Sequence, residues 1–274
     1  MTAFKTQSSR AIILHGHVFA KPQTPRAVMT LVHGFGEHCE RYTNMAAHLA
    51  ESGIATVALD LRGHGKSEGK RGVVRDYSDY FDDLTCLLEK SRSEYPDIPH
   101  ILYGHSMGGG LVIDYMLKEK PDDISAVIAS APLLRLAEPV PAPLKLIMRG
   151  LTKVLPDFSM SQPVKGEAVS TLADEQKLYV DDPLNHGTLG GRLALGMIAR
   201  GEDSLSNAAK FTQPLLLLHS KDDVLTDFTA SETFSQKAPN CVFLPFEGVA
   251  HEMHNDKSRP QVYSAMIDFI ETHI

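Results

Sequence analysis

The stretch Tyr103-Gly104-His105-Ser106-Met107-Gly108-Gly109 decides the fold of this chain, because it places a serine between two different elements. The apolar pair Ile101-Leu102 before it predicts a strand, and the residues from Leu111 to Met116 predict a helix. A serine at such a junction needs strained backbone angles, and the two flanking glycines let strand and helix approach closely. We expect this turn to expose the Ser106 hydroxyl to a substrate.

Strands and helices alternate on both sides of the turn. Nearly continuous apolar runs predict strands buried on both faces at residues 28–32, 56–60, 124–129, 214–218 and 242–246. Helical patterns cover residues 42–52, 76–88 and 228–237, and a last helix begins near Pro260. Residues 11–20 predict two short strands hinged near Gly16 at an antiparallel edge. The alternation predicts an α/β fold with a mostly parallel central sheet flanked by helices.

The alternation is interrupted between residues 135 and 208, where Pro139, Pro141 and Pro143 break the chain and no convincing strand follows. We expect a core built from residues 1–134 and 209–274, with residues 135–208 forming a helical cap. One apolar stripe in this segment contains Leu144, Ile147, Met148, Leu151, Val154 and Leu155. The stripe fits the core face of an all-helical insertion and fits equally a cap that lines a pocket and touches lipid.

Composition narrows the class of protein. The 274 residues include 34 Asp and Glu against 27 Lys and Arg, giving a net charge of −7 without a basic run, which argues against a nucleic-acid partner. Three scattered cysteines predict no disulfide framework and a reducing compartment. No stretch has the length of a signal-peptide core or a membrane span. We expect a cytoplasmic protein, with any membrane contact transient, hydrophobic and confined to the cap.

Three loops at the expected carboxyl ends of strands supply a nucleophile, an acid and a base in the order Ser106, Asp223, His251. A serine hydroxyl is a poor nucleophile near neutral pH, so Ser106 needs a base to take its proton. His251 suits this role because imidazole titrates near working pH. Asp223 would fix the tautomer of His251 and stabilise the imidazolium that forms.

Each assignment has rivals. Other candidate bases are His254, one helical turn from His251, and the histidines of other loops, at positions 33, 38, 64 and 105. Asp222 and Asp227 compete with Asp223 for the acid. We favour His251 because it lies in the glycine-containing loop after the last strand. The stretch from His251 to His254 is one residue short of H-E-x-x-H, so we expect no metal.

The loop His33-Gly34-Phe35-Gly36 fits one half of an oxyanion hole, since two backbone N–H groups can stabilise the charge that forms on a carbonyl oxygen. Met107, directly after the nucleophile, supplies one donor, and Phe35 is the best choice for the other. We expect His33 to brace this loop, and Glu37, His38 and Arg41 to form a buried polar network. Nucleotide-binding glycine motifs are absent from the sequence, so we expect no cofactor.

The sequence resembles the monoacylglycerol lipase and lysophospholipase branch of the α/β-hydrolase family, the serine aminopeptidase S33-like hydrolases. Three motifs carry the resemblance: residues 33–38 with Arg41-Tyr42, residues 60–69, and residues 104–109. Within the insertion, residues 155–159 and 182–184 also resemble the family's cap. Ser220 departs from the pattern, because the family commonly has glycine there. This departure weakens the alignment that distinguishes Asp223 from Asp222 as the acid.

The resemblance implies a serine carboxylic ester hydrolase with Ser106, Asp223 and His251 as its triad and Phe35 and Met107 as its oxyanion donors. It also implies a cap that shapes an acyl-chain channel, for which we expect Leu151, Ile147 and Met148 to bind substrate. The expected substrate is a monoacylglycerol or a lysophospholipid. Other readings are an esterase or aminopeptidase for small substrates, and a ligand-binding relative with little turnover. A peptidase would need a pocket carboxylate, for which Glu138, Glu167 and Asp174 are available.

Overall fold

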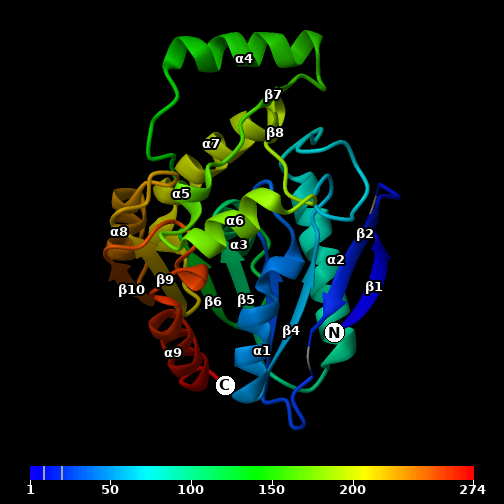
Figure 1. Ribbon diagram of the computed structural model, residues 1–274, viewed down its shortest axis with the longest axis vertical. Helices are drawn as coiled ribbons and strands as arrows, with labels where there is room; N and C mark the ends of the chain where they lie inside the picture. Colours follow the sequence, from blue (N-terminus) through cyan, green and yellow to red (C-terminus); the bar gives the residue numbers. More distant parts are fainter. Residues whose placement is uncertain (9, 20) are drawn as a thin grey trace.

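Eight strands form one sheet through the middle of the computed structural model, which describes residues 1–8, 10–19 and 21–274 (Figure 1). In chain order the strands are β1 (Thr2–Gln7), β2 (Ile13–Val18), β3 (Ala27–Val32), β4 (Ile54–Leu59), β5 (His100–His105), β6 (Ile124–Ser130), β9 (Leu215–Ser220) and β10 (Cys241–Phe246). Across the sheet their order is β1-β2-β4-β3-β5-β6-β9-β10. The pairs from β4 to β10 are parallel, whereas β1–β2 and β2–β4 are antiparallel. The predicted mostly parallel sheet is confirmed.

Burial explains why the apolar runs form the central strands. Every residue of β3, β4, β5 and β9 is buried, as continuous apolar runs predict for strands covered on both faces. β10 lies at the edge of the sheet, and most of its side chains are partly exposed.

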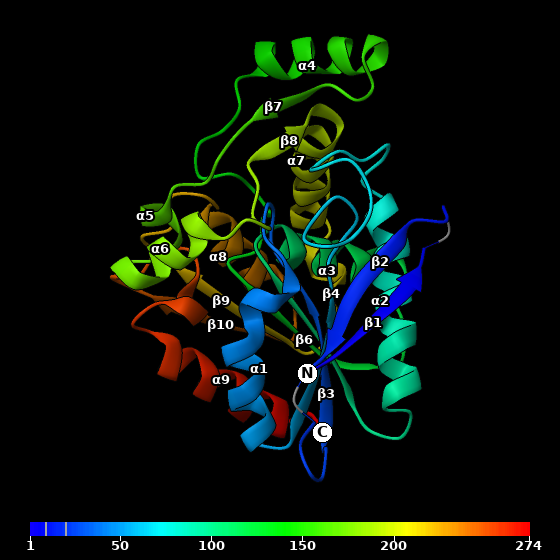
Figure 2. The same cartoon turned by 45° about the vertical axis from the view of Figure 1, so that its right-hand side comes forward.

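Helices cover both faces of the sheet (Figure 2). One face packs against α1 (Thr43–Glu51) and α9 (Arg259–Glu271), which share an apolar core that includes Leu49 and Ile270. The opposite face packs against α2 (Asp79–Glu94), α3 (Met107–Lys118) and α8 (Phe228–Lys237). Short 3-10 helices are η1 (Cys39–Tyr42), η2 (Ala208–Lys210) and η3 (Met253–Asn255). The predicted helices are confirmed, with ends shifted by a few residues.

In the amino-terminal region the expected antiparallel edge is confirmed, but the expected hinge near Gly16 is wrong. Residues 13–18 form the single strand β2, which continues through Gly16 and pairs with β1 instead of folding back at the glycine. Gly16 serves packing: a Cβ there would lie 2.4 Å from the Phe4 ring and 2.5 Å from the Ala58 carbonyl oxygen. The antiparallel partner therefore comes from residues 2–7. Ala20, the end of the predicted pair, lies outside the described residues.

The segment between β6 and β9 lies over the carboxyl ends of the parallel strands (Figures 1 and 2). It contains α4 (Ala142–Val154), β7 (Ser159–Ser161), α5 (Gly166–Val169), α6 (Ala173–Asp181), β8 (Thr188–Gly190) and α7 (Gly191–Ser206). The expectation of no strand here is wrong, because β7 and β8 pair as an antiparallel ribbon. α7 packs closely on the core: a Cβ at Gly201 would lie 2.3 Å from the Leu134 carbonyl oxygen. α4, by contrast, stands at the far end of the molecule (Figure 1).

In the described part of the chain, none of the helices combines the length and the apolar character that crossing a bilayer requires.

Candidate active site

Ser106 occupies the turn between β5 and α3, as the sequence predicts. Its backbone angles are φ 54° and ψ −119°, a strained conformation for a residue with a side chain. A Cβ at Gly104 would lie 2.3 Å from the Gly108 carbonyl oxygen, and one at Gly108 would lie 2.4 Å from the carbonyl oxygens of Val32 and His33. The glycines are therefore required by close backbone packing, which holds the serine at the carboxyl edge of the sheet.

Asp223 and His251 meet across the loops that follow β9 and β10. His251 Nδ1 lies 2.6 Å from Asp223 Oδ2, and both side chains are buried. The second carboxylate oxygen of Asp223 accepts hydrogen bonds from the backbone N–H groups of Leu225 (2.8 Å) and Thr226 (3.1 Å). This geometry brings together the acid and the base that the sequence proposes.

The electrostatics of this pair favour an ionised acid and a basic imidazole. Burial acts to raise the pKa of Asp223, but the charge of His251 and hydrogen bonds from His219 and His251 hold that pKa well below its ordinary value. Burial acts to lower the pKa of His251, yet the charge and hydrogen bond of Asp223 outweigh it and raise that pKa. Both shifts favour the ion pair that forms when His251 takes up a proton.

The other acids are occupied elsewhere. Asp222 accepts a hydrogen bond from the Gly248 N–H at 2.6 Å. Asp227 accepts one from the Thr229 N–H at 2.9 Å and so caps α8. Neither carboxylate lies at His251, so geometry favours Asp223 among the three.

The rival histidines also have different surroundings. His254 is buried and stacks on Tyr42, with ring centroids 5.0 Å apart, and its pKa is lowered well below the ordinary value by burial and by neighbouring His105. His33 Nε2 accepts the Leu61 N–H at 2.9 Å, which is the bracing expected from the sequence. His38 pairs with Asp182 of the insertion at 2.8 Å. His64 packs its ring against His33.

The loop after β3 lies directly against Ser106. A Cβ at Gly34 would lie 3.1 Å from Ser106 Cβ. The Gly34 N–H donates to Glu37 Oε1 at 2.6 Å and is therefore committed to that carboxylate. Met107, whose N–H is the other expected donor, begins α3 immediately after Ser106.

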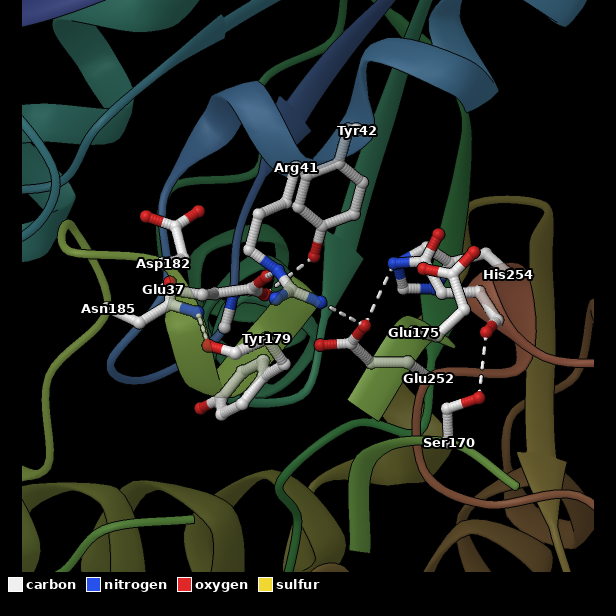
Figure 3. A network of polar contacts seen from close by, with 12 residues as sticks. Glu37, Arg41, Tyr42, Ser170, Glu175, Tyr179, Asp182, Asn185, Glu252 and His254 are labelled. Atoms are coloured by element: carbon white, nitrogen blue, oxygen red, sulfur yellow. Dashed lines mark hydrogen bonds and ion pairs between the residues drawn. The ribbon is translucent and has the colours of Figure 1, made fainter. Parts of the chain in front are cut away.

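A buried polar network lies beside this loop (Figure 3). Arg41 pairs with Glu37 through Nε (3.1 Å to Oε2) and with Glu252 through a terminal nitrogen. Tyr42 donates to Glu37 Oε1 at 2.7 Å, and the Tyr179 ring of α6 lies 4.5 Å from the Arg41 guanidinium carbon. The sequence places Glu37, His38 and Arg41 in such a network, and His38 pairs there with Asp182. It does not identify Glu252 and Tyr179, which come from distant segments.

Three groups in this region come close enough to ligate a cation: Glu37, His105 and Glu252, whose ligand atoms lie within 4.8 Å of one another. The Arg41 guanidinium already contacts both carboxylates. Burial acts to lower the pKa of Arg41, but Glu252 and Glu37 outweigh it and raise that pKa. The arrangement suits a guanidinium better than a metal ion, because the positive charge that the carboxylates need is already present.

A cavity of about 720 Å³ opens above Ser106 and His251 and is walled mainly by apolar side chains of the insertion. Of the three cap residues proposed from the sequence, Met148 is buried in its wall. Ile147 is 64% exposed and Leu151 half-buried, and neither belongs to the wall. Leu144 of the predicted stripe also lines the wall, together with residues that the sequence did not single out, among them Leu136, Val140, Met160 and Leu189.

Two further polar residues hold Asp223 from positions that sequence reasoning passed over. Thr226 Oγ1 donates to Asp223 Oδ2 at 2.8 Å, and His219 Nε2 lies 3.2 Å from the same oxygen. The only signal for His219 is a polar side chain at the end of the apolar run from Leu215 to Leu218.

Comparison with known proteins matches this chain to hydrolases at the levels of family, sequence and structure. The profile of the family described as serine aminopeptidase, S33, matches residues 23–258. A monoacylglycerol lipase of Mycolicibacterium smegmatis is 32% identical over 267 residues, covering 94% of this chain and 92% of its own. A phospholipase of Bacillus subtilis is 28% identical over 257 residues, covering 93% and 98%. The crystal structure of Paleococcus ferrophilus monoacylglycerol lipase, at 29% identity, has a TM-score of 0.84 and covers 95% of this chain and 99% of that one.

Proposed function

We propose a substrate and a mechanism for a chain that belongs to the α/β-hydrolase family described as serine aminopeptidase, S33, and is therefore a serine hydrolase. The proposed reaction is cleavage of the ester bond of a monoacylglycerol, releasing a fatty acid and glycerol. The observation that carries it is the largely apolar cavity that opens on Ser106 and His251 beneath the insertion. Such a cavity suits a single acyl chain, because apolar walls favour transfer of the chain out of water.

In this proposal Ser106 attacks the ester carbonyl while His251 takes the proton from its hydroxyl. His251 then gives that proton to the leaving glycerol oxygen, and water releases the acid from the acyl-enzyme by the same steps. The 2.6 Å contact between His251 and Asp223 supports these roles, since it holds the imidazole in one tautomer. Only unprotonated His251 can act as the base, so activity should fall as pH drops through the raised pKa of His251.

The oxyanion donors in this proposal are the N–H groups of Phe35 and Met107. Phe35 is favoured because the preceding amide, that of Gly34, donates to Glu37. Met107 is favoured because it begins α3, where N–H groups point out of the helix and attract negative charge.

We further propose that residues 135–208 act as a cap and that α4 makes transient contact with lipid. Leu146, Ile147 and Val154 on α4 are 64–78% exposed. Residues 142–154 also contain Lys145, Arg149 and Lys153 and no acidic residue, so the local charge is positive although the net charge is −7. This pattern, an exposed apolar face with cations around it, is typical of helices that lie on membrane surfaces. A cytoplasmic setting fits the three free cysteines.

The test is hydrolysis of glycerol monoesters from acetyl to palmitoyl, with matching lysophospholipids, by the unmodified chain and by Ser106→Ala. We expect activity that rises toward medium or long chains and that falls about 10⁴-fold or more in Ser106→Ala. Ser264→Ala, which removes an exposed hydroxyl on α9, serves as the matched control and should retain full activity. Preference for acetyl esters, or equal activity in Ser106→Ala, would contradict the proposal.

Two other substrate classes are tested beside the glycerol monoesters. A lysophospholipase would cleave lysophospholipids faster than glycerol monoesters. The similarity to a phospholipase is the reason to test this substrate class. An aminopeptidase would cleave amino-acid anilides and needs a carboxylate for the free amine. Glu138 lies in the cavity wall, whereas Glu167 and Asp174 do not, so Glu138→Gln is the variant that tests this reading.

A further inference from the structure

His219 is a fully buried histidine that the mechanism above does not use. It is the penultimate residue of β9 and follows four leucines, so its ring lies where an apolar side chain would be expected. Burying an imidazole among apolar neighbours is costly unless its nitrogens are hydrogen-bonded. Both nitrogens have partners: Nδ1 lies 2.7 Å from Ser231 Oγ, and Nε2 lies 3.2 Å from both Asp223 Oδ2 and Thr226 Oγ1.

The Asp223 carboxylate assigns the tautomer of the ring, because an ionised carboxylate can only accept a hydrogen bond from Nε2. Thr226 Oγ1 gives its own hydrogen to Asp223 Oδ2 and is therefore also an acceptor toward Nε2. Ser231 is fully buried on α8, and its hydroxyl can donate to Nδ1. The proton of a neutral imidazole then resides on Nε2, the nitrogen that faces the carboxylate. Nε2 is therefore a hydrogen-bond donor to Asp223 Oδ2. The same oxygen accepts from Thr226 and from His251.

We propose that His219 is a positioning residue of the Ser106–Asp223–His251 triad, whose Nε2–H shares Asp223 Oδ2 with His251 and so sets the pH at which His251 becomes protonated. The proposal rests on the triad given under the proposed function. A second donor withdraws negative charge from Oδ2 and leaves less of it to stabilise the His251 imidazolium. His219 thereby keeps His251 unprotonated, and so able to act as a base, down to a lower pH than Asp223 alone would allow.

Other charged and titratable groups also face the pair, and they stay in place when His219 is changed. His105 of β5 lies against His251, with ring centroids 4.7 Å apart. The carboxylates of Glu252 and Glu37 act on His251 from the polar network, which also contains Arg41, and His254 lies behind His105. On the side of α8, His219 meets only Ser231 and the Phe228 ring among the described contacts.

The test measures the acid side of the pH profile in His219→Phe, which keeps an aromatic ring at this position and removes the donor. Two readouts serve: kcat/KM for a p-nitrophenyl ester, and the rate at which a fluorophosphonate labels Ser106, both from about pH 5 to about pH 9. We expect the acid limb of both profiles to move to higher pH by roughly half a unit or more. His219→Gln, which retains an N–H donor, should restore the original limb.

Ser231→Ala gives a second, independent variant. Without the Ser231 hydroxyl the proton of His219 is no longer held on Nε2, so the limb should move in the same direction by a smaller amount. This variant also carries the test if His219→Phe does not fold. The matched control is His100→Phe, which replaces another buried histidine. His100 is the first residue of β5, at the end opposite to His105, so this variant should leave the acid limb unchanged.

An acid limb that stays in place in both His219→Phe and Ser231→Ala, or that moves to lower pH, would overturn the inference. Failure of the triad itself gives a different result: the fluorophosphonate would then label Ser106→Ala as fast as the unmodified chain. In one-dimensional proton NMR spectra, the low-field signal of the His251 Nδ1 proton should also shift in His219→Phe and not in His100→Phe.

Discussion

Asp223 shows how a buried carboxylate is kept ionised. Two backbone N–H groups hold one oxygen, and His251, Thr226 and His219 surround the other. Its folded-state pKa is therefore depressed despite burial. The stability that this carboxylate contributes is present above the unfolded pKa of about 4 and is lost as pH falls through the folded value.

Arg41 is the residue on which two buried carboxylates depend. Replacing it in Arg41→Met would leave Glu37 and Glu252 close together without a positive charge. We expect the free energy of unfolding to fall by about 3–5 kcal/mol, the usual cost of breaking a buried ion pair. Activity should also fall, because Glu37 holds the Gly34 amide beside Ser106. Urea denaturation and ester hydrolysis measure the two effects.

The matched control for Arg41 is Arg92→Met, which breaks a pair with Asp123 on the surface. Exposed pairs contribute little, so the expected loss is below about 1 kcal/mol. Equal losses in the two variants would mean that the buried Arg41 network contributes no more to the free energy of unfolding than an exposed ion pair.

At the scale of elements, β8 and the turn before it tie the insertion to the core loops. The His186 N–H donates to the Gly36 carbonyl oxygen, and the Gly190 N–H donates to that of Gly72, both at 2.8 Å. Gly72 has φ +60°, and a Cβ there would lie 1.8 Å from the Thr188 carbonyl oxygen. The contact between β8 and this loop therefore depends on a glycine.

Gly72→Ala should loosen that contact. We expect a loss of roughly 1–3 kcal/mol in stability from backbone strain and displacement of β8, with reduced activity on long-chain esters. The control is Gly150→Ala in α4, where a Cβ meets nothing within 4 Å. Since alanine favours helix more than glycine, that variant should be up to about 1 kcal/mol more stable. Thermal unfolding compares the two, and a neutral Gly72→Ala would show that β8 is not held there.

At the scale of the whole molecule, α4 lies at one end (Figure 1), and it both carries exposed apolar residues and lines the cavity through Leu144 and Met148. Docking through α4 would bring the pocket to the lipid surface that holds its proposed substrate. α4 therefore combines exposed apolar side chains with a positive local charge at that end of the molecule.

The double variant Leu146→Asp/Ile147→Asp should weaken binding to phospholipid vesicles about tenfold or more, because each change removes apolar area from the contact. Co-sedimentation measures binding, and hydrolysis of a short-chain ester, expected to be unchanged, measures the state of the site. Leu178→Asp on α6, with 65% exposure, is the control. An equal effect of Leu178→Asp would assign binding to the cap as a whole rather than to α4.

The sequence by itself determined the features that depend on local backbone demands. The strand, glycine-flanked serine and helix around Ser106 can be predicted because the change of element and the close approach of Gly104 to Gly108 are encoded within a few residues. The buried strands follow from apolar runs, and the order of the three proposed triad residues follows from the alternation of elements. β2 is the exception, because Gly16 predicts a hinge between two short strands, whereas it is required by packing against Phe4 and Ala58 of neighbouring strands.

Only the tertiary structure decided which groups meet across long separations. It brought Asp223 rather than Asp222 to His251, placed Glu252 and Tyr179 at Arg41, and set His219 behind the carboxylate. It also turned Met148 into the cavity and Ile147 to solvent, although one helical stripe contains both. The physical reason is that such contacts are fixed by the packing of whole elements, which a local pattern of residues does not specify.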